Sequence, residues 1–270
     1  MDMDLSEKVA IVTGATANIG RAISLGLAAE GMTVIAVGRD EEAGAKLATA
    51  GEQNGIGAIR FVRADLLDAG APAGILAAAD AIGPAAVLVN NVGGNIGSGF
   101  FAGSDPASWA GDIDLNLGTI LRMTHAVLPG MIERGGGAIV NIGSTAGLVG
   151  DYMLPVYSAA KAAVHGFTKV LAKEVGQHGI RVNCVAPYGT VSRDPEAFST
   201  GSRFHPDSSF FSKAFAETSS ADMAKRSRQT VVGRPVATPE EVASLAIYLA
   251  SGKASFITGQ VYPVDGGSLL

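Results

Sequence analysis

Ser144, Tyr157 and Lys161 are the side chains of this sequence whose types and spacing are best suited to chemistry. On a helix, a tyrosine and a lysine four positions apart share one face. A free phenol has a pKa of about 10, and a neighbouring ammonium group favours the phenolate and lowers that pKa. A serine hydroxyl aimed at the same point can hydrogen-bond a carbonyl or alcohol oxygen. The set therefore suits proton transfer to or from a substrate oxygen while another group moves hydride.

Two predicted elements position these side chains. The apolar run at 138–142 predicts a strand that is buried on both faces, so Ser144 comes just after the end of a strand. The run at 157–175 has small and apolar residues every three or four positions, which predicts a helix carrying both Tyr157 and Lys161. A tyrosine and a lysine also occur at this spacing on solvated helix surfaces, so the interpretation depends on the rest of the chain.

Length and composition predict one α/β domain. The chain has 270 residues, of which 47% are hydrophobic and 36 are glycines. A net charge of −5 provides no basic surface for nucleic acid. The lone Cys184 excludes an internal disulfide, and the chain shows neither a signal core nor an apolar run of membrane-spanning length. We expect a cytoplasmic protein that binds neither nucleic acid nor membranes and has no metal site.

The stretch at 8–31 predicts a strand, a turn of small residues and a helix. Backbone N–H groups at the start of such a helix can hold a pyrophosphate. Gly14 allows the chain to turn and a ligand to approach closely, and Gly20 allows the helix to pack against the strand. We therefore predict the phosphate-binding turn of a dinucleotide site.

A second strand, predicted at 32–40, bears on the choice of cofactor. Its end usually carries an acidic residue for the ribose hydroxyls, whereas this chain has Gly38 followed by Arg39. A guanidinium group offers a planar set of donors for a 2′-phosphate. We therefore expect NADP(H) in preference to NAD(H), although an arginine in solvent beside Asp40 would leave the choice open.

Three later strands are expected at 58–66, 85–94 and 180–190. Asp65 near the end of the first is suited to accept from an adenine amino group or to cap the next helix. Asn91 and the glycines that follow it suit the ligand crevice at the carboxyl edge of an open sheet. With about seven strands alternating with helices, the chain predicts a single-domain, doubly wound, mostly parallel seven-stranded sheet of the Rossmann type over residues 1–270.

Two segments interrupt this alternation. The long helix expected at about 106–133 contains Asn116 in an apolar setting, where its amide must be satisfied by a partner such as a bound water. Residues 192–235 are rich in Ser and Phe and have weak periodicity, which predicts a lid. Its phenylalanines indicate that the lid packs on something apolar; they are Phe198, Phe204, Phe210, Phe211 and Phe215.

Taken together, these stretches resemble the short-chain dehydrogenase/reductase family over essentially the whole chain. The resemblance rests on the order and spacing of TGATANIG (13–20), NNVG (90–93), Asn116, Ser144, YSAAK (157–161), IRVNCVAP (180–187) and TGQVYPVDGG (258–267). It implies a Rossmann-type fold, a nicotinamide dinucleotide cofactor and, as is usual among similar proteins, a homo-tetramer.

The resemblance also implies roles for individual residues. Tyr157 would be the acid/base, and Lys161 would lower its pKa and hold the nicotinamide ribose. Ser144 would position the substrate oxygen, and Asn116 would anchor a water of a proton relay. The residues expected to bind the cofactor are Gly14, Thr16, Asn18, Ile19, Gly20, Arg39, Asp65, Leu66, Asn91, Gly93, Tyr157, Lys161, Pro187, Gly189 and Thr190.

Three positions depart from the family pattern. Asn18 stands where the family has a glycine, and asparagine tolerates the left-handed φ that such a turn needs. Val92 replaces a family alanine. Tyr188 either replaces a family glycine or reflects a one-residue insertion, so the transfer of a nicotinamide contact to Thr190 or Ser192 stays open.

We predict an NADP(H)-preferring oxidoreductase that interconverts a secondary alcohol and a ketone. Met153, Leu154, Tyr188 and the phenylalanines indicate a bulky apolar or cyclic substrate. One alternative is a reductase of 3-oxoacyl thioesters carried by acyl carrier protein or coenzyme A, for which basic residues are available at Arg193, Arg203, Lys213, Lys225, Arg226 and Arg228. Another alternative is a non-catalytic dinucleotide-binding sensor, which is expected to have lost the tyrosine or the lysine.

Overall fold

The computed structural model describes residues 2–53, 56–199 and 219–270. One sheet of seven strands, all parallel, has the order β3-β2-β1-β4-β5-β6-β7. The strands are β1 (Val9–Thr13), β2 (Thr33–Gly38), β3 (Ala58–Arg63), β4 (Ala85–Asn90), β5 (Gly137–Ile142), β6 (Ile180–Pro187) and β7 (Val261–Val264). The sheet predicted from the sequence is confirmed.

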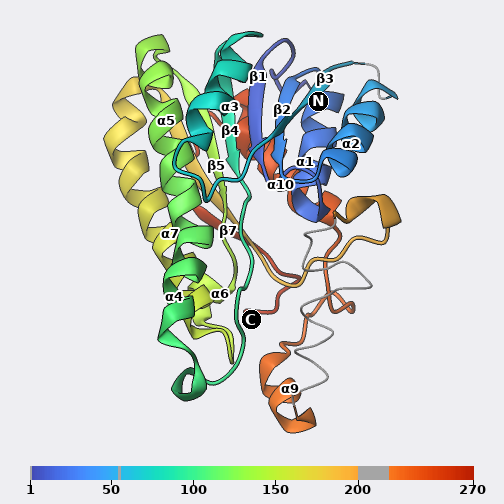
Figure 1. Ribbon diagram of the computed structural model, residues 1–270, viewed down its shortest axis with the longest axis vertical. Coiled ribbons are helices and arrows are strands. Elements are labelled where there is room, and N and C mark those ends of the chain that lie inside the picture. The colour runs from blue at the N-terminus through green and yellow to red at the C-terminus, as the bar shows by residue number, and fades with distance from the viewer. Residues whose placement is uncertain (1, 54–55, 200–218) are drawn as a thin grey trace.

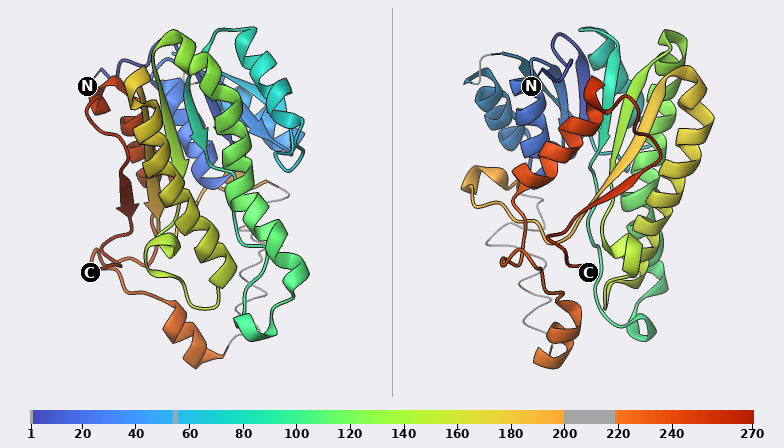
Figure 2. Two further views of the ribbon diagram at one scale, coloured as in Figure 1. Left: turned by 90° about the vertical axis from the view of Figure 1, so that its left-hand side faces the viewer. Right: turned by 180° about the vertical axis from the view of Figure 1, so that it is seen from behind.

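Helices cover both faces of the sheet (Figure 1). The described residues contain α1 (Asn18–Ala29), α2 (Glu41–Gln53), α3 (Ala71–Asp80), α4 (Pro106–Ile113), α5 (Thr119–Arg134), α6 (Ala146–Val149), α7 (Pro155–Val175), α9 (Ser220–Arg226) and α10 (Pro239–Ala250). One layer contains α1 and α10, which pack on each other, and the other contains α3, α5 and α7. In the left view of Figure 2 the layer with α5 (green) and α7 (yellow) faces the viewer, whereas the right view shows this layer on one side of the sheet and α1 (blue) and α10 (red) on the other.

The two helical layers explain why the strands read as unbroken apolar runs. In β1, Ala10 and Val12 pack into the core beneath α1 and α10, whereas Val9 and Ile11 pack into the core beneath α3, α5 and α7. Every residue of β1 is buried. A parallel strand covered on both faces has no solvent side, so polar residues do not alternate along it.

The order of the strands places a crevice at their carboxyl ends. The chain runs outward from β1 to β3 and then returns to β4, which lies on the other side of β1. Ligands bind at such a switch point in open α/β sheets. Here the loops after the two strands are joined, because the Thr13 hydroxyl accepts the backbone N–H groups of Asn91 at 2.9 Å and Val92 at 3.2 Å.

The single helix expected at about 106–133 has an interruption. Between α4 and α5, residues Asp114–Gly118 form a π-helical turn that contains Asn116. The Asn116 amide donates to the carbonyl oxygen of Asp112 at 2.9 Å, which joins this turn to the end of α4. Such turns inside α-helices are frequent at functional sites.

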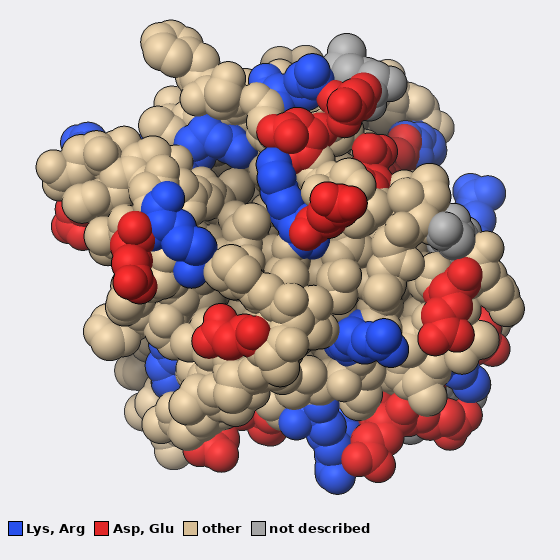
Figure 3. Space-filling view, turned by 90° about the horizontal axis from the view of Figure 1, so that it is seen from above, with Lys and Arg blue, Asp and Glu red and all other residues tan. Residues whose placement is uncertain are grey.

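Surface charge is mixed on the face seen from above in Figure 3, where acidic and basic side chains are interspersed. No helix of the described residues is long and apolar enough to cross a membrane.

Candidate active site

A cleft of about 1360 Å³ lies at the carboxyl edge of the sheet. It collects most of the residues predicted to bind cofactor or substrate, although they come from seven separate segments of the chain. Those that line it are Gly14, Thr16, Asn18, Ile19, Arg39, Asp65, Leu66, Asn91, Gly93, Ser144, Leu154, Tyr157, Lys161, Pro187, Tyr188, Gly189 and Thr190.

Tyr157 and Lys161 lie one turn apart on α7, as predicted. The Lys161 Nζ atom is 5.8 Å from the centroid of the Tyr157 ring and donates to the carbonyl oxygen of Ile142 at 2.9 Å. Only 3% of Lys161 is exposed. Burial lowers the pKa of Lys161 to about 8, because the charged form loses hydration. At neutral pH the amine is therefore still mostly protonated, and its charge acts in a poorly solvated place.

Ser144 follows β5 directly and is 8% exposed. Its Oγ atom accepts the backbone N–H of Ala146 at 3.1 Å, at the start of the short helix α6. A hydroxyl that accepts in this way keeps its own proton for donation. Ser144 can therefore donate a hydrogen bond to a substrate oxygen in the cleft.

Asn116 lies behind the cleft lining and is fully buried. Its amide group joins the π-helical turn to the loop after β4. The oxygen accepts the N–H of Gly94 at 2.9 Å, and the nitrogen donates to the carbonyl oxygen of Gly94 at 2.8 Å. A Cβ atom on Gly93 would lie 2.9 Å from both Asn116 Oδ1 and Lys161 Nζ, so a small space separates the amide from the amine.

The phosphate-binding turn fits a dinucleotide. Gly14 has φ +61°, and a Cβ atom on Gly20 would lie 2.1 Å from the carbonyl oxygen of Gly14. Ala17 occupies the N-cap of α1 and its side chain makes no capping hydrogen bond, so it does not satisfy the first N–H groups of this helix. Together with the positive end of the helix dipole, these groups are suited to the pyrophosphate of a bound cofactor.

Asn18 adopts the left-handed conformation expected for it, with φ +43°. Its Nδ2 atom donates to the carbonyl oxygen of Thr190 at 3.2 Å, which connects the phosphate-binding turn to the segment after β6. Asn91 also supports the turn, because its amide donates to the carbonyl oxygens of Thr13 at 3.1 Å and Gly14 at 3.0 Å.

Gly38 and Arg39 lie at the end of β2, where the cofactor's adenosine ribose is expected. A Cβ atom on Gly38 would lie 2.7 Å from the side chain of Thr16, so a carboxylate at position 38 would require Thr16 to move. Arg39 forms an exposed ion pair with Asp65 at 3.6 Å.

The prediction that Asp65 caps the next helix is wrong. Helix α3 begins only at Ala71, and the Asp65 carboxylate instead accepts the backbone N–H of Leu67 in a turn.

Met153 does not line the cleft, so the structure gives no contact in support of its predicted substrate role. It adopts φ +65°, and its carbonyl oxygen accepts the N–H of Gly99 at 2.8 Å. Gly20 and Asn116 are also absent from the lining and act through packing and hydrogen bonds behind it.

Six residues named above lie outside the described part of the chain: Arg203, Phe204, Phe210, Phe211, Lys213 and Phe215.

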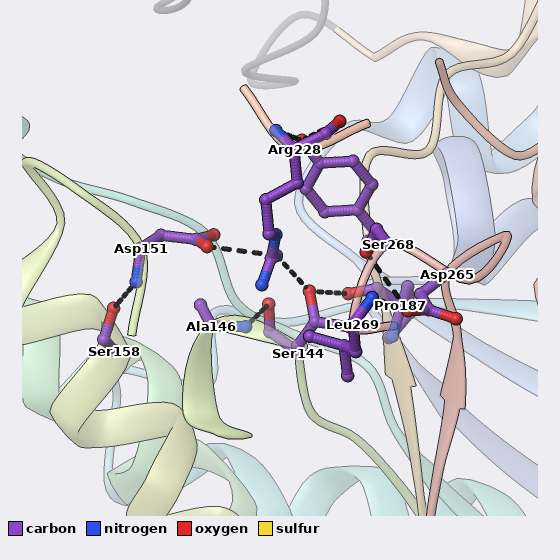
Figure 4. A network of polar contacts seen from close by, with 11 residues as sticks. Ser144, Ala146, Asp151, Ser158, Pro187, Arg228, Asp265, Ser268 and Leu269 are labelled. Atoms are coloured by element: carbon purple, nitrogen blue, oxygen red, sulfur yellow. Dashed lines mark hydrogen bonds and ion pairs between the residues drawn. The ribbon is translucent and has the colours of Figure 1, made fainter. Parts of the chain in front are cut away.

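Sequence reasoning missed Asp112, Thr145 and Asp151. Asp112 is buried, and its carboxylate accepts the N–H groups of Ile96 at 3.0 Å and Gly97 at 3.4 Å. The one signal for it was an acidic residue four positions before Asn116 within an apolar helix. Thr145 and Asp151 line the cleft and both bind Arg228 (Figure 4).

The chain is similar to known proteins in both sequence and structure. The model of the family described as short chain dehydrogenase matches residues 8–198, and a model described as Enoyl-(Acyl carrier protein) reductase matches residues 211–268. The chain is 34% identical to the 3-oxoacyl-[acyl-carrier-protein] reductase FabG of Vibrio harveyi over 98% of each chain. It is 35% identical to the 3beta-hydroxysteroid dehydrogenase of Mediterraneibacter gnavus, covering 97% of this chain and 94% of that one.

Among solved structures, the L-sorbose reductase of Gluconobacter frateurii in complex with NADPH and L-sorbose is similar, with a TM-score of 0.84 and 29% identity. The match covers 100% of this chain and 99% of that chain. The dinucleotide-type turn, the Ser144, Tyr157 and Lys161 arrangement and these matches agree. The chain belongs to the short-chain dehydrogenase/reductase family of oxidoreductases.

Proposed function

We propose that the protein is an NADP(H)-preferring enzyme that interconverts a secondary alcohol and a ketone, with Tyr157 as the acid/base. One observation carries the proposal: a buried amine, Lys161, lies beside the Tyr157 ring in the cleft that Ser144 also lines. A bound nicotinamide would supply or accept the hydride. In ketone reduction, the Tyr157 hydroxyl gives its proton to the carbonyl oxygen.

Lys161 and Ser144 stabilise the negative charge that develops on Tyr157 and on the substrate oxygen during this proton transfer. The Lys161 ammonium favours the phenolate that Tyr157 becomes, and its burial strengthens the interaction because little water screens it. The Ser144 hydroxyl donates to the substrate oxygen and fixes its position. Preorganised donors of this kind supply a large part of the rate enhancement in many enzymes.

Three features support NADP(H). Gly38 leaves the end of β2 without a carboxylate, Thr16 fills the space that a side chain there would need, and Arg39 supplies a cation at the same end of the cleft. The similar L-sorbose reductase was solved with NADPH.

Apolar side chains support a substrate with a bulky apolar body. Ile96, Leu154, Val191 and Met223 line the cleft with the catalytic residues. The second candidate function, reduction of 3-oxoacyl thioesters, is favoured by the similarity to the Vibrio harveyi reductase. Comparing turnover of a 3-oxoacyl thioester with that of cyclic and aryl ketones separates the two.

We also propose that residues 192–235 act as a substrate lid. We further propose that the enzyme is a cytoplasmic homo-tetramer. Light scattering would measure this state of assembly.

Replacement of Tyr157 by Phe tests the mechanism. General acid–base catalysis is worth about 100- to 10,000-fold, so we expect kcat to fall by that range on any accepted ketone while NADPH still binds. Tyr248→Phe is the matched control, because Tyr248 lies on α10 and does not line the cleft. Turnover of Tyr157→Phe within a few-fold of the parent enzyme would overturn the assignment.

A further inference from the structure

We propose that the substrate carries a carboxylate and that Arg228, assisted by Arg226, binds this group next to Ser144. The inference rests on the proposed function and names the class of substrate, an oxo acid or the corresponding hydroxy acid. It adds an anionic end to the apolar body described above.

The hydrogen bonding of Arg228 is the first observation. Its Nη2 atom donates to Asp151 Oδ1 at 3.0 Å and to Thr145 Oγ1 at 2.7 Å. Its Nε and Nη1 atoms are buried and have no hydrogen-bond partner within the described part of the chain. Guanidinium has five N–H donors, so three of them lack an acceptor. Buried donors are costly to leave unsatisfied, and a ligand with anionic oxygens would satisfy them.

The guanidinium group is held in place before any ligand binds. Its carbon lies 4.5 Å from the centroid of the Tyr188 ring, against which it stacks. The Tyr188 hydroxyl accepts the backbone N–H of Arg228 at 2.9 Å, so the same tyrosine supports both the main chain and the side chain. A donor group fixed in this way loses little entropy on binding, which favours recognition of a planar carboxylate.

A second basic residue at this end of the cleft is the second observation. Arg226 and Arg228 both line it, as does Asp151, which pairs with Arg228. A substrate carboxylate bound at Arg228 would therefore also be attracted by the positive charge of Arg226.

The position of Arg228 relative to Ser144, which is proposed to hold the substrate oxygen, is the third observation. Figure 4 shows its guanidinium group reaching between Asp151 and the segment that carries Ser144 and Ala146. Arg228 donates a hydrogen bond to Thr145, which directly follows Ser144 in the chain. A short carbon chain would thus join a carboxylate on Arg228 to a carbonyl oxygen on Ser144.

Matched substrates test the proposal. We would measure kcat/KM with NADPH for 3-oxobutanoate, 4-oxopentanoate and 5-oxohexanoate, and for the methyl ester of each. We expect the parent enzyme to prefer at least one acid over its ester. Arg228→Gln should reduce that preference roughly 10- to 100-fold, the range for a charge-assisted hydrogen bond, and Arg226→Gln by less. Arg228→Lys should keep part of it, since the charge is retained.

Lys225→Gln is the control, because it removes the same charge from α9 at an exposed position that does not line the cleft. It should leave the acid-to-ester ratio unchanged. If Arg228 were only structural, Arg228→Gln would lower the melting temperature and leave the ratio unchanged, which would overturn the proposal. Equal turnover of acids and esters by the parent enzyme would overturn it as well, while leaving the proposed function intact.

A binding measurement decides the proposal independently of turnover. Calorimetry would compare 4-hydroxypentanoate with its methyl ester on the enzyme saturated with NADP⁺. Tighter binding of the acid, lost in Arg228→Gln and kept in Lys225→Gln, supports the anion site even if no ketone is reduced and the proposed function fails. Equal binding of acid and ester overturns the site.

Discussion

The side chains of Asn116 and Lys161 approach the same point in space, since each lies 2.9 Å from the place that a Cβ atom on Gly93 would take. Asn116 comes from the π-helical turn and Lys161 from α7. The absence of a side chain at Gly93 therefore keeps a small polar space open between an amide oxygen and an ammonium group. The proton relay expected for Asn116 would need such a space for its water.

Gly93→Ala should fill this space. The added methyl group would push the end of the Lys161 side chain away from Tyr157, and misplacement of a catalytic group by about 1 Å costs on the order of 100-fold in rate. We expect kcat/KM to fall by about that factor in steady-state assays. Gly97→Ala is the control in the same loop, because a Cβ atom there would meet no atom within 4 Å. Similar activities of the two variants would contradict the role given to Gly93.

The burial of Lys161 should appear in the pH dependence of stability. Its pKa is about 8 in the folded, cofactor-free protein against 10.5 for an exposed lysine, so above pH 8 the unfolded chain binds more protons at this residue. The free energy of unfolding should therefore rise with pH, by about 1 kcal/mol between pH 8 and pH 9.

Urea unfolding at these two pH values measures the effect, and Lys161→Met should lose this increment. Burial also raises the pKa of the Cys184 thiol from 9.0 to about 12, which acts in the opposite direction increasingly as pH approaches and passes 9. The window therefore ends at pH 9. If the free energy of unfolding changed equally between pH 8 and pH 9 in the parent and in Lys161→Met, Lys161 would have to be solvated.

His165 should destabilise the fold in acid. It lies one turn after Lys161 on α7, and only 4% of it is exposed. Burial, together with the charge of Lys161, lowers its pKa from 6.5 to about 4. As pH falls from 6.5 towards 4, the unfolded chain takes up a proton before the folded protein does. The free energy of unfolding should thus fall by about 2–3 kcal/mol across this range.

Thermal or urea unfolding of His165→Gln should show a weaker dependence on pH in that range. His125→Gln is the comparison, because His125 is exposed on α5. If both variants kept the full acid sensitivity of the parent, other groups would be responsible for it.

Arg39 should determine the preference for NADPH. Its ion pair with Asp65 is exposed, and pairs of this kind are worth little, so a 2′-phosphate can compete for the guanidinium group. We expect Arg39→Gln to raise KM for NADPH about 10- to 100-fold and to change KM for NADH by less than about 3-fold. Arg63→Gln, which removes an exposed arginine paired with Glu41 outside the cleft, should change neither value. An unchanged ratio of the two KM values in Arg39→Gln would remove the basis for the NADP(H) proposal.

The sequence by itself determined the sheet and the pairing of Tyr157 with Lys161. Runs such as Val9–Thr13 are apolar throughout, because parallel strands covered on both faces have no polar side, and this pattern is local. Tyr157 and Lys161 could be paired from the sequence because four residues make about one turn of any α-helix. The left-handed conformation of Asn18 also followed from its residue type and its place in the turn.

Only the tertiary structure decided which distant residues meet. Arg228 bonds to Thr145 across 83 residues, and Asn18 bonds to the carbonyl oxygen of Thr190 across 172. Periodicity and turn signals extend over only a few residues, so they carry no information about such pairs. For the same reason the sequence suggested Met153 for the substrate site, whereas Met153 is not part of the cleft lining and Asp151 is. The sequence offered six basic residues for the substrate, and the fold placed Arg226 and Arg228 of them in that lining.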